Sequence, residues 1–302
     1  MSETGKISGV MGFCCTVDTP LLAGSWGGWE AADTTLQRSS VTGIPKVDGS
    51  VWKGAMAARL PFALEKNESV SFKGKVIKIS CSELRLLFFA VQSVQGTFLL
   101  LTCPCVLKQF LNDMVWYGYL PEEYKDYLKG IESKLRDRTA LRWGYGQESE
   151  KNWDVFGGMP YTIHGFPERD IPNPLVRAGI PEETADKAIL VSDREFMHFV
   201  WHETEFVTRN KEESDIETGR VVGTEEVFTE EYIPEGSVLY GFINEFMDVL
   251  YPAEVLKGIT EDLREDSLEQ ENITFKLQMG KNEALGKGWT TFTALTQNGG
   301  GE

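Results

Sequence analysis

The hydrophobic pattern of the first part of the chain predicts several strands and two helices. Apolar runs that are typical of strands cover residues 10–17, 75–80, 84–91 and 97–102. A helix is predicted to start at Asp48-Gly49-Ser50, because apolar residues then recur at helical spacing until Pro61 stops them. A second helix is predicted from Pro104, since the first turn of a helix tolerates proline. The chain is therefore predicted to mix strands with helices.

The second half of the chain is predicted to contain a long, charged β-hairpin. Strand signals cover residues 196–208 and 220–233, and the polar segment 209–219 between them ends in glycine. This tip has too few apolar residues to hold a core, so we expect it to protrude and to be flexible or to order only on a partner. Beyond it the pattern predicts strands at 237–243, 273–279 and 289–295, an acidic helix at 252–268 and a glycine-rich loop at 280–288.

Three further segments have a less regular pattern of apolar and polar residues. Residues 18–48 are predicted to be a long loop, and loops of this length are usually functional or mobile. A helix is expected after Pro121, with apolar residues from Tyr124 to Leu135 along one stripe. Residues 143–174 are rich in Gly, Pro and Trp and are predicted to be an irregular insertion that packs through its aromatic side chains.

Composition excludes several classes of protein. The 302 residues are 41% hydrophobic and 25% charged, which is typical of a globular chain and not of a disordered or fibrous one. The five cysteines contain no C-x-x-C pair, which argues against a disulfide framework or a zinc ribbon. No apolar run approaches the roughly 20 residues that span a bilayer, and the start lacks a signal-peptide pattern. We therefore expect no membrane segment and a cytoplasmic location.

The net charge of -16 is distributed unevenly along the chain. Residues 1–200 hold 22 Lys and Arg against 24 Asp and Glu, a net charge of -2, whereas residues 201–302 hold 8 against 22, a net charge of -14. Distribution matters more than the sum for binding a polyanion. An RNA-binding face is therefore compatible with the first two thirds of the chain.

Histidine chemistry is not expected. The surroundings of His198 and His202 favour one face of a strand, no H-E-x-x-H motif is present, and His164 is the one other histidine of the sequence.

Two segments can bring backbone N–H groups close to a phosphate. The Gly280–Gly288 loop carries two lysines but is not a Walker A loop, because the lysine before its last glycine is not followed by Ser or Thr. A plain tight turn is the alternative. The helix start at Gly49, with Lys53 and Arg59 following, offers an anion site or is an ordinary capped helix. Asp33, in the long loop, is on composition alone a solvated aspartate.

The order of these segments resembles a known family. VDTPLLAGS at 17–25, ADTTLQR at 32–38 and GIPKVDGSVWKGA at 43–55 resemble the amino-terminal signature of the RAMP superfamily, and most closely the repeated backbone subunit of type III-B (Cmr) CRISPR effector complexes. TCPCVLK at 102–108, FTEEYIP at 228–234 and the 280–288 loop extend the resemblance. Leu22 stands where the family usually has histidine, and Val47 to Ser50 replace a Pro-Gly-Ser-Ser-like run.

The resemblance implies an α+β fold. It implies a ferredoxin-like (RRM-like) palm over about residues 1–103 and 234–302, a helical fingers insertion over about 104–195, and a protruding β-hairpin thumb over about 196–233. Copies of such a subunit stack into a filament along a guide RNA, and each thumb displaces a nucleotide of the guide–target duplex. Guide RNA, target RNA, further copies of the chain and other subunits of the complex are thus the implied partners.

The resemblance also implies a site. It assigns target-RNA cleavage to Asp33, which would act with Mg2+ on attack by the RNA 2′-OH, because Mg2+ typically accepts one or two carboxylates plus phosphates. The implied RNA-binding residues are Arg38, Ser50, Lys53, Arg59, Gly280, Lys281, Gly286, Lys287 and Gly288. One alternative is a structural subunit that binds guide RNA without cutting. Another is a guide-maturing ribonuclease of the same superfamily, against which the scarcity of histidine counts.

Overall fold

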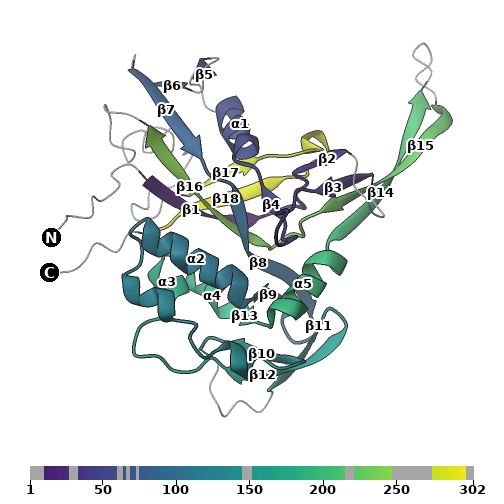
Figure 1. The fold of residues 1–302 in the computed structure, drawn as a ribbon. Coiled ribbons are helices and arrows are strands. Elements are labelled where there is room, and N and C mark those ends of the chain that lie inside the picture. Colours follow the sequence, from purple (N-terminus) through teal and green to yellow (C-terminus); the bar gives the residue numbers. More distant parts are fainter. Residues whose placement is uncertain are drawn as a thin grey trace.

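The computed structural model describes residues 10–26, 33–59, 64–65, 69–72, 75–144, 152–214, 221–246 and 274–296. They form a mixed α/β fold with one large, mainly antiparallel sheet and one small sheet, as Figure 1 shows. Within these ranges no helix is long and apolar enough to cross a membrane. The predicted acidic helix at 252–268 lies outside them.

The large sheet is organised around the first strand. β1 (Val10–Val17) lies between β16 (Val238–Phe246) and β18 (Trp289–Ala294), antiparallel to both. The sheet continues on one side through β17 (Thr274–Gln278) and on the other through β8 (Leu84–Ser93) and β9 (Thr97–Thr102). Shorter strands at its margin are β4 (Lys46–Val47), β5 (Leu64–Glu65), β6 (Ser69–Phe72) and β7 (Lys75–Cys81). Chain segments from both ends of the sequence thus meet at one strand.

Helix α1 (Gly49–Arg59) packs on this sheet through Trp52. The Trp52 ring is fully buried and stacks on Phe292 with ring centroids 5.5 Å apart, while Phe13 meets it edge-on. Gly49 is required by close approach, because a Cβ there would lie 2.2 Å from the Cys81 carbonyl oxygen. The helix start is therefore held tightly against the turn between β7 and β8.

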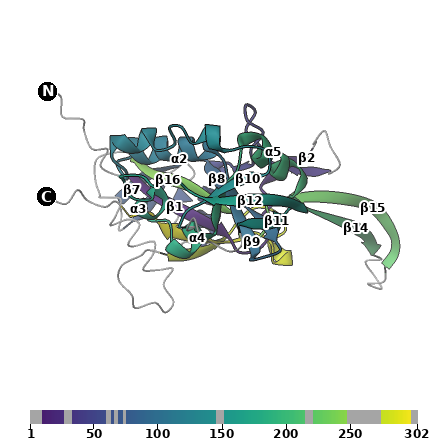
Figure 2. The same cartoon turned by 90° about the horizontal axis from the view of Figure 1, so that it is seen from below.

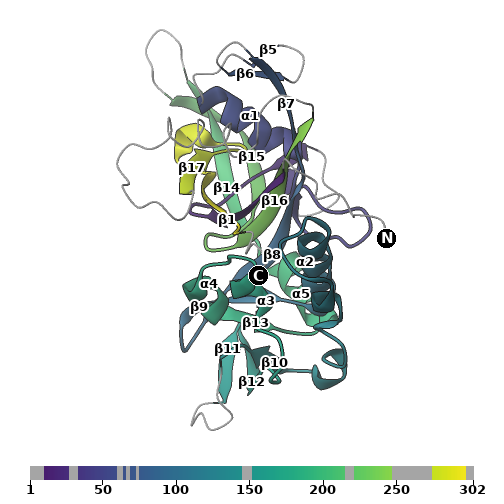
Figure 3. The same cartoon turned by 90° about the vertical axis from the view of Figure 1, so that its left-hand side faces the viewer.

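The region from residue 104 to residue 202 adds helices and extends the sheet. Its helical elements are α2 (Pro104–Trp116), two 3-10 turns (Glu122–Asp126 and Glu132–Lys134), α3 (Pro174–Arg177), α4 (Glu182–Lys187) and α5 (Asp193–His202). Its strands are β10 (Thr139–Arg142), β11 (Trp153–Phe156), β12 (Met159–Gly165) and β13 (Ala188–Leu190). In Figure 3 this region lies below the strands that carry α1.

The predicted hairpin is present and protrudes. β14 (Glu205–Ser214) pairs with β15 (Val221–Tyr232), and the pair extends away from the rest of the molecule in Figure 2. At its root β15 also pairs with β3 (Thr34–Leu36), which in turn pairs with β2 (Gly24–Trp26). The segment predicted to be a long loop therefore contains three short strands, β2, β3 and β4, and two of them complete the hairpin's own sheet.

One predicted strand is wrong in its first part. Residues 193–202 form helix α5, and β14 begins only at Glu205. The Ser192 hydroxyl caps the helix by accepting a hydrogen bond from the Glu195 N–H, and it also donates to the Glu195 carboxylate. The residues match the Ser-x-x-Glu capping-box pattern, although the carboxylate binds the hydroxyl and not the Ser192 N–H. Phe196, Phe199 and Val200 are buried along one face. The aromatic and β-branched content favoured a strand, but the cap and the 3.6-residue spacing prevailed.

Two other expectations are corrected. The segment after Pro121 makes two short 3-10 turns, because Gly130, with φ +76°, interrupts helical geometry between them. Residues 143–174 are not an irregular insertion, since they include β11 and β12, which join β10 in the large sheet. Aromatic packing does hold this region, as Trp143 stacks on Phe166 at 4.7 Å.

Two glycines of α1 give a matched test of this packing. We expect Gly49→Ala to lower the free energy of unfolding by about 1–3 kcal/mol, because the new methyl group would overlap the Cys81 carbonyl. Gly54 has open space at its Cβ position, so Gly54→Ala should raise it by about 0.5–1 kcal/mol through helix propensity. Urea unfolding followed by circular dichroism measures both. Equal stability of Gly49→Ala and the wild type would contradict the packing.

Candidate functional site

Asp33 lies at the root of the hairpin. Its backbone N–H donates to the Thr229 carbonyl oxygen at 2.9 Å, and its carboxylate oxygen Oδ2 accepts from the Thr229 N–H at 2.8 Å. The residue is exposed. Asp33 is thus held at two points on the edge of β15, with its carboxylate at the protein surface.

Arg38, predicted to bind RNA, is largely used inside the protein. Its guanidinium forms an ion pair with Glu231 and donates to the carbonyl oxygens of Gly43 at 3.1 Å and Val200 at 2.9 Å. It also lies over the Trp201 ring, 4.1 Å from the centroid. Only 12% of the Arg38 side chain is exposed. These contacts join the end of β3 to helix α5 and to the hairpin.

Glu231, the ion-pair partner of Arg38, is a buried carboxylate of β15, and the neighbouring Glu230 is another that lies on the opposite face of the strand. Glu230 forms an ion pair with Arg209 at 2.8 Å and accepts hydrogen bonds from the Asn282 amide at 2.9 and 3.0 Å. Asn282 also donates to the Tyr232 hydroxyl at 2.7 Å. Burial, together with the neighbouring Glu230, raises the pKa of Tyr232 above its ordinary value. The hairpin root is therefore bound to the glycine-rich loop on this side.

The glycine-rich loop is a shaped turn. Gly280 and Gly288 have φ values of +95° and +79°, and a Cβ would lie 2.5 Å from the Leu22 carbonyl oxygen in the first case and 2.0 Å from the Met279 carbonyl oxygen in the second. The Lys281 N–H donates to the Leu22 carbonyl at 2.9 Å. Gly286 has φ +77° with open space beside it. The loop is therefore pressed against the segment that follows β1.

Lys287 turns toward the hairpin. Its Nζ lies 3.1 Å from the Glu205 carboxylate and 5.0 Å from the centre of the Tyr232 ring. Lys287, which was predicted to bind RNA, therefore has an ion-pair partner and an aromatic contact within the protein.

The start of helix α1 already carries a carboxylate. The Asp48 Oδ1 accepts from the Ser50 N–H at 2.9 Å, and Ser50 is exposed. Hydrogen bonds from the Ser50 hydroxyl and N–H, together with nearby Lys46, outweigh partial burial and hold the pKa of Asp48 below its ordinary value. Lys53 is half-buried, and Arg59 is the last residue of the helix. The helix start therefore already has an anionic cap at Asp48.

Among the predicted residues, Asp33, Arg38 and Lys287 lie at the hairpin root, while the others lie on α1 or in the glycine-rich loop. The Asp48 N–H donates to the Gln37 side chain at 3.0 Å, which links the α1 start to the segment that carries Asp33 and Arg38. The glycine-rich loop reaches β15 from its other face through Asn282. Pattern analysis missed Glu230, Glu231 and Asn282. The usable signal was a pair of adjacent acids inside an otherwise strand-like run, because alternation places one of them on each face.

The histidines lie on a helix and not on a strand as predicted. His198 and His202 are one turn apart on α5, both exposed, with ring centroids 4.6 Å apart. Among the residues that the structure describes, no group of three or more His, Cys, Asp or Glu is arranged to hold a metal ion.

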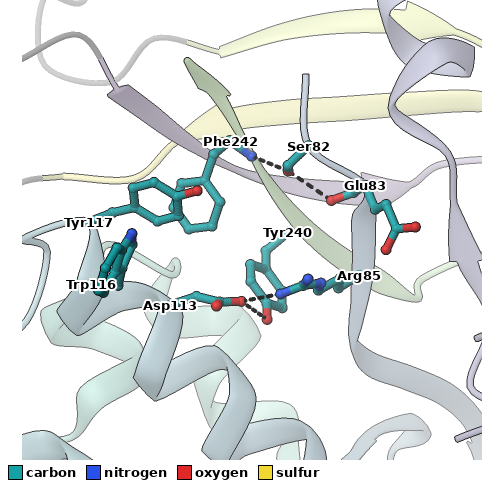
Figure 4. Close-up of a pocket in the computed structure, with 8 residues that line it drawn as sticks. All are labelled: Ser82, Glu83, Arg85, Asp113, Trp116, Tyr117, Tyr240 and Phe242. Carbon is teal, nitrogen blue, oxygen red and sulfur yellow. Dashed lines mark hydrogen bonds and ion pairs between the residues drawn. The ribbon is translucent and has the colours of Figure 1, made fainter. Parts of the chain in front are cut away.

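A surface pocket of about 300 Å³ lies between α2, β16 and the start of β8. Figure 4 shows its floor, where the Asp113 carboxylate accepts hydrogen bonds from Arg85 at 2.7 Å and from the Tyr240 hydroxyl at 2.8 Å. Burial and the neighbouring Asp113 raise the pKa of Tyr240 well above its ordinary value. Trp116 forms an exposed wall. Each charged group of the floor is paired, so the pocket does not present an activated acid or base.

No known protein-family model matches the chain. The CRISPR system Cmr endoribonuclease Cmr4 of Pyrococcus furiosus is 25% identical over 304 residues, which cover 93% of this chain and 95% of that protein.

Two solved structures share the fold. The crystal structure of oligomeric Cmr4 from Pyrococcus furiosus matches with a TM-score of 0.62 and 20% identity, over 96% of this chain and 100% of that chain. A chain of the type III-B Cmr-beta complex bound to cognate target RNA matches with a TM-score of 0.65 and 15% identity, over 96% of this chain and 98% of that chain.

The Asp48 cap generates a prediction about pH. Asp48→Ala should lower the free energy of unfolding by about 1 kcal/mol at neutral pH, the usual cost of losing a cap. Because the folded-state pKa is depressed, the contribution of Asp48 is complete above the ordinary carboxyl value of about 4 and is lost as the pH falls through the lower folded value. Urea unfolding of both proteins from pH 7 to pH 2.5 should show the difference shrinking. A difference that stays constant to pH 2.5 would rule out the charged cap.

Proposed function

We propose, on the premise that this chain is a RAMP protein homologous to the type III-B backbone subunit Cmr4, that it binds guide RNA as a repeated subunit of an effector complex and cuts the target RNA. The relative is an endoribonuclease by name, and one similar structure is part of a complex bound to target RNA. The observation that carries the proposal is the exposed Asp33 carboxylate, fixed on Thr229 at the root of a protruding hairpin.

The chemistry asks little of the protein. RNA supplies its own nucleophile, the 2′-OH, so cutting requires alignment of this hydroxyl with the phosphorus and stabilisation of charge on the phosphate oxygens. A protruding hairpin that enters the duplex would splay the RNA backbone beside its own root. Asp33 lies there with one carboxylate oxygen already oriented by the Thr229 N–H. The Asp33 carboxylate would therefore need only a small movement to orient the 2′-OH and the phosphate.

A divalent ion is part of this proposal, with Asp33 as its protein carboxylate. Mg2+ characteristically takes one or two protein carboxylates and completes its shell with phosphate oxygens and water. Asp33 would hold such an ion, which would supply charge stabilisation at the phosphate when bound.

Guide recognition would depend on the RNA backbone. The exposed Ser50 at the α1 start, Lys53 and Arg59 on the same helix, and Lys281, Gly286 and Gly288 of the glycine-rich loop are the proposed contacts. Backbone N–H groups and lysines bind phosphate without reading sequence. Lys287 would join them by exchanging its contact with Glu205 for one with phosphate.

The finer architecture belongs to the same proposal. The strands around β1 with α1 would form a ferredoxin-like palm, residues of about 104–195 the fingers, and the β14–β15 hairpin the thumb. Further copies of the chain would continue the filament, as the oligomeric Cmr4 structure supports. The second candidate function is a guide-binding subunit that does not cut. The location of Asp33 against the hairpin root favours the cutting subunit.

Asp33→Ala tests the cutting activity directly. We expect assembly with guide RNA and target binding to stay within about twofold, because Asp33 holds no buried partner, while target cutting falls at least about 10²-fold, as for loss of a group that acts on the reacting atoms. Gel analysis of end-labelled target RNA with Mg2+ measures the rate, and filter binding measures affinity. If the complex with Asp33→Ala cut target RNA at the wild-type rate, either this subunit would only bind guide RNA or another of its residues would be responsible for cutting.

A shortened hairpin tests the thumb. Residues 211–226 are replaced by Asn-Gly, which forms a two-residue turn between the paired Asn210 and Val227. We expect the thermal midpoint to change little and guide binding to persist, but the regular spacing of cut products to be lost. Sequencing gels read the cut positions. A collapse of thermal stability would show instead that the outer hairpin is part of the core.

A further inference from the structure

We propose that the buried pair of Glu231 and Arg38 sets the register of β3 on β15 and thereby orients the Asp33 carboxylate. Glu231 is then a positioning residue for the cutting reaction and does not touch RNA. This inference rests on the proposed function, since it concerns the same carboxylate. The inference gives Arg38 a role inside the protein, whereas the family resemblance implied that it binds RNA.

β3 has little backbone pairing of its own to hold its place on the hairpin. It is three residues long, and its parallel pairing with β15 consists of the single residue pair Thr34 and Glu230. Because side chains alternate along a strand, a slip of one residue would turn every β3 side chain to the other face. Asp33, the residue directly before β3, would then leave Thr229. Together with the Asp33 N–H bond to the Thr229 carbonyl, the single Thr34–Glu230 pair gives the register little backbone support, so side-chain contacts must add to it.

Glu231 provides a side-chain substitute for the missing ladder. Its Oε2 accepts a hydrogen bond from the Leu36 N–H at 3.1 Å, two residues beyond the last paired position of β3. Leu36 is buried, so without the Glu231 carboxylate its N–H would have neither a protein acceptor nor water to bind. The same carboxylate accepts from the Thr204 hydroxyl at 3.0 Å. Glu231 thus ties the end of β3 to the hairpin and to the segment before β14.

Arg38 locks this carboxylate from the other side. It pairs with Glu231 and is itself held by the Gly43 and Val200 carbonyls and by the Trp201 ring. Side-chain exposure is 12% for Arg38 and 6% for Glu231. A buried charge pair of this kind has one low-energy geometry, because displacing either group leaves the other buried without a partner. Register errors in β3 are therefore costly.

The two adjacent acids of β15 have separate roles. Glu231 binds Arg38 on one face, whereas Glu230 points to the opposite face and binds Arg209 and Asn282. Asp33 binds the backbone edge of the same strand at Thr229. Movement of the hairpin root would thus be transmitted to Asp33 through Thr229 and Glu231 together. The geometry couples the hairpin to the carboxylate without any direct RNA contact.

The first experiment compares Glu231→Gln with Glu235→Gln in the assembled complex with guide RNA. Glu235 is exposed in the turn after β15, so its variant removes the same charge without touching β3. We expect Glu231→Gln to bind target RNA within about twofold of wild type but to cut about 10- to 100-fold more slowly, the scale of effect of misplacing a reacting group by about 1 Å. Faster hydrogen exchange of the Leu36 and Thr229 amides should accompany this loss. Glu235→Gln should match the wild type.

A second variant separates positioning from folding. Arg38→Met combined with Glu231→Gln removes both charges, so the unpaired buried charge of a single variant is gone and the thermal midpoint should recover toward wild type. Cutting should stay slow, because the β3 register is still not fixed. If cutting recovers together with stability, or if Glu231→Gln cuts at the wild-type rate, the inference is overturned. Should the single variant not fold, the double variant carries the test.

Asp33→Ala, measured in parallel, distinguishes the two levels. Slow cutting by Asp33→Ala with normal cutting by Glu231→Gln refutes the positioning role and leaves the proposed function standing. Normal cutting by Asp33→Ala refutes the proposed function itself.

Discussion

The burial of two adjacent carboxylates at the hairpin root is the constraint on which this structure depends. Glu230 and Glu231 are both almost fully buried, and a buried charge is tolerated only when it is paired and hydrogen-bonded. Since strand alternation sends them to opposite faces, each must draw its partners from a different part of the chain. Arg38 and Leu36 come to one face and Asn282 to the other. The hairpin root thereby gathers segments more than 200 residues apart.

This constraint explains why the loops around the root are ordered. The segment before β4 has little apolar content of its own, yet Arg38 anchors it to helix α5 and Gln37 anchors it to the start of α1. The glycine-rich loop is held in the same way by Asn282 and by close backbone contacts at Gly280 and Gly288. These polar and backbone contacts add to the burial of Leu22, Leu36 and Met279 in holding the short segments in place. The base of the hairpin is therefore fixed by contacts from several parts of the chain.

Local signals were sufficient for most regular elements and failed where two signals competed. The apolar runs correctly located β1, β8, β9 and α2. Around Phe196 the aromatic content favoured a strand, and the capping-box pattern at Ser192 was the signal that would have corrected it. The strands β11 and β12 were missed although they form a hairpin with each other across Gly157 and Gly158, which is a local turn signal. Their attachment to β8 and β10, in contrast, lies outside their own segment. Pairing across the chain is invisible to a local pattern.

Residue order alone indicated the mixture of strands and helices and the charged hairpin, because these depend on spacing within short windows. Asp33 became a candidate only through the resemblance to the RAMP superfamily. Tertiary contacts decided how that carboxylate is held and which way Arg38 points. Those outcomes depend on which distant group satisfies a buried charge or an unpaired N–H, and the free energy of such a pairing exists only once the chain has closed around it.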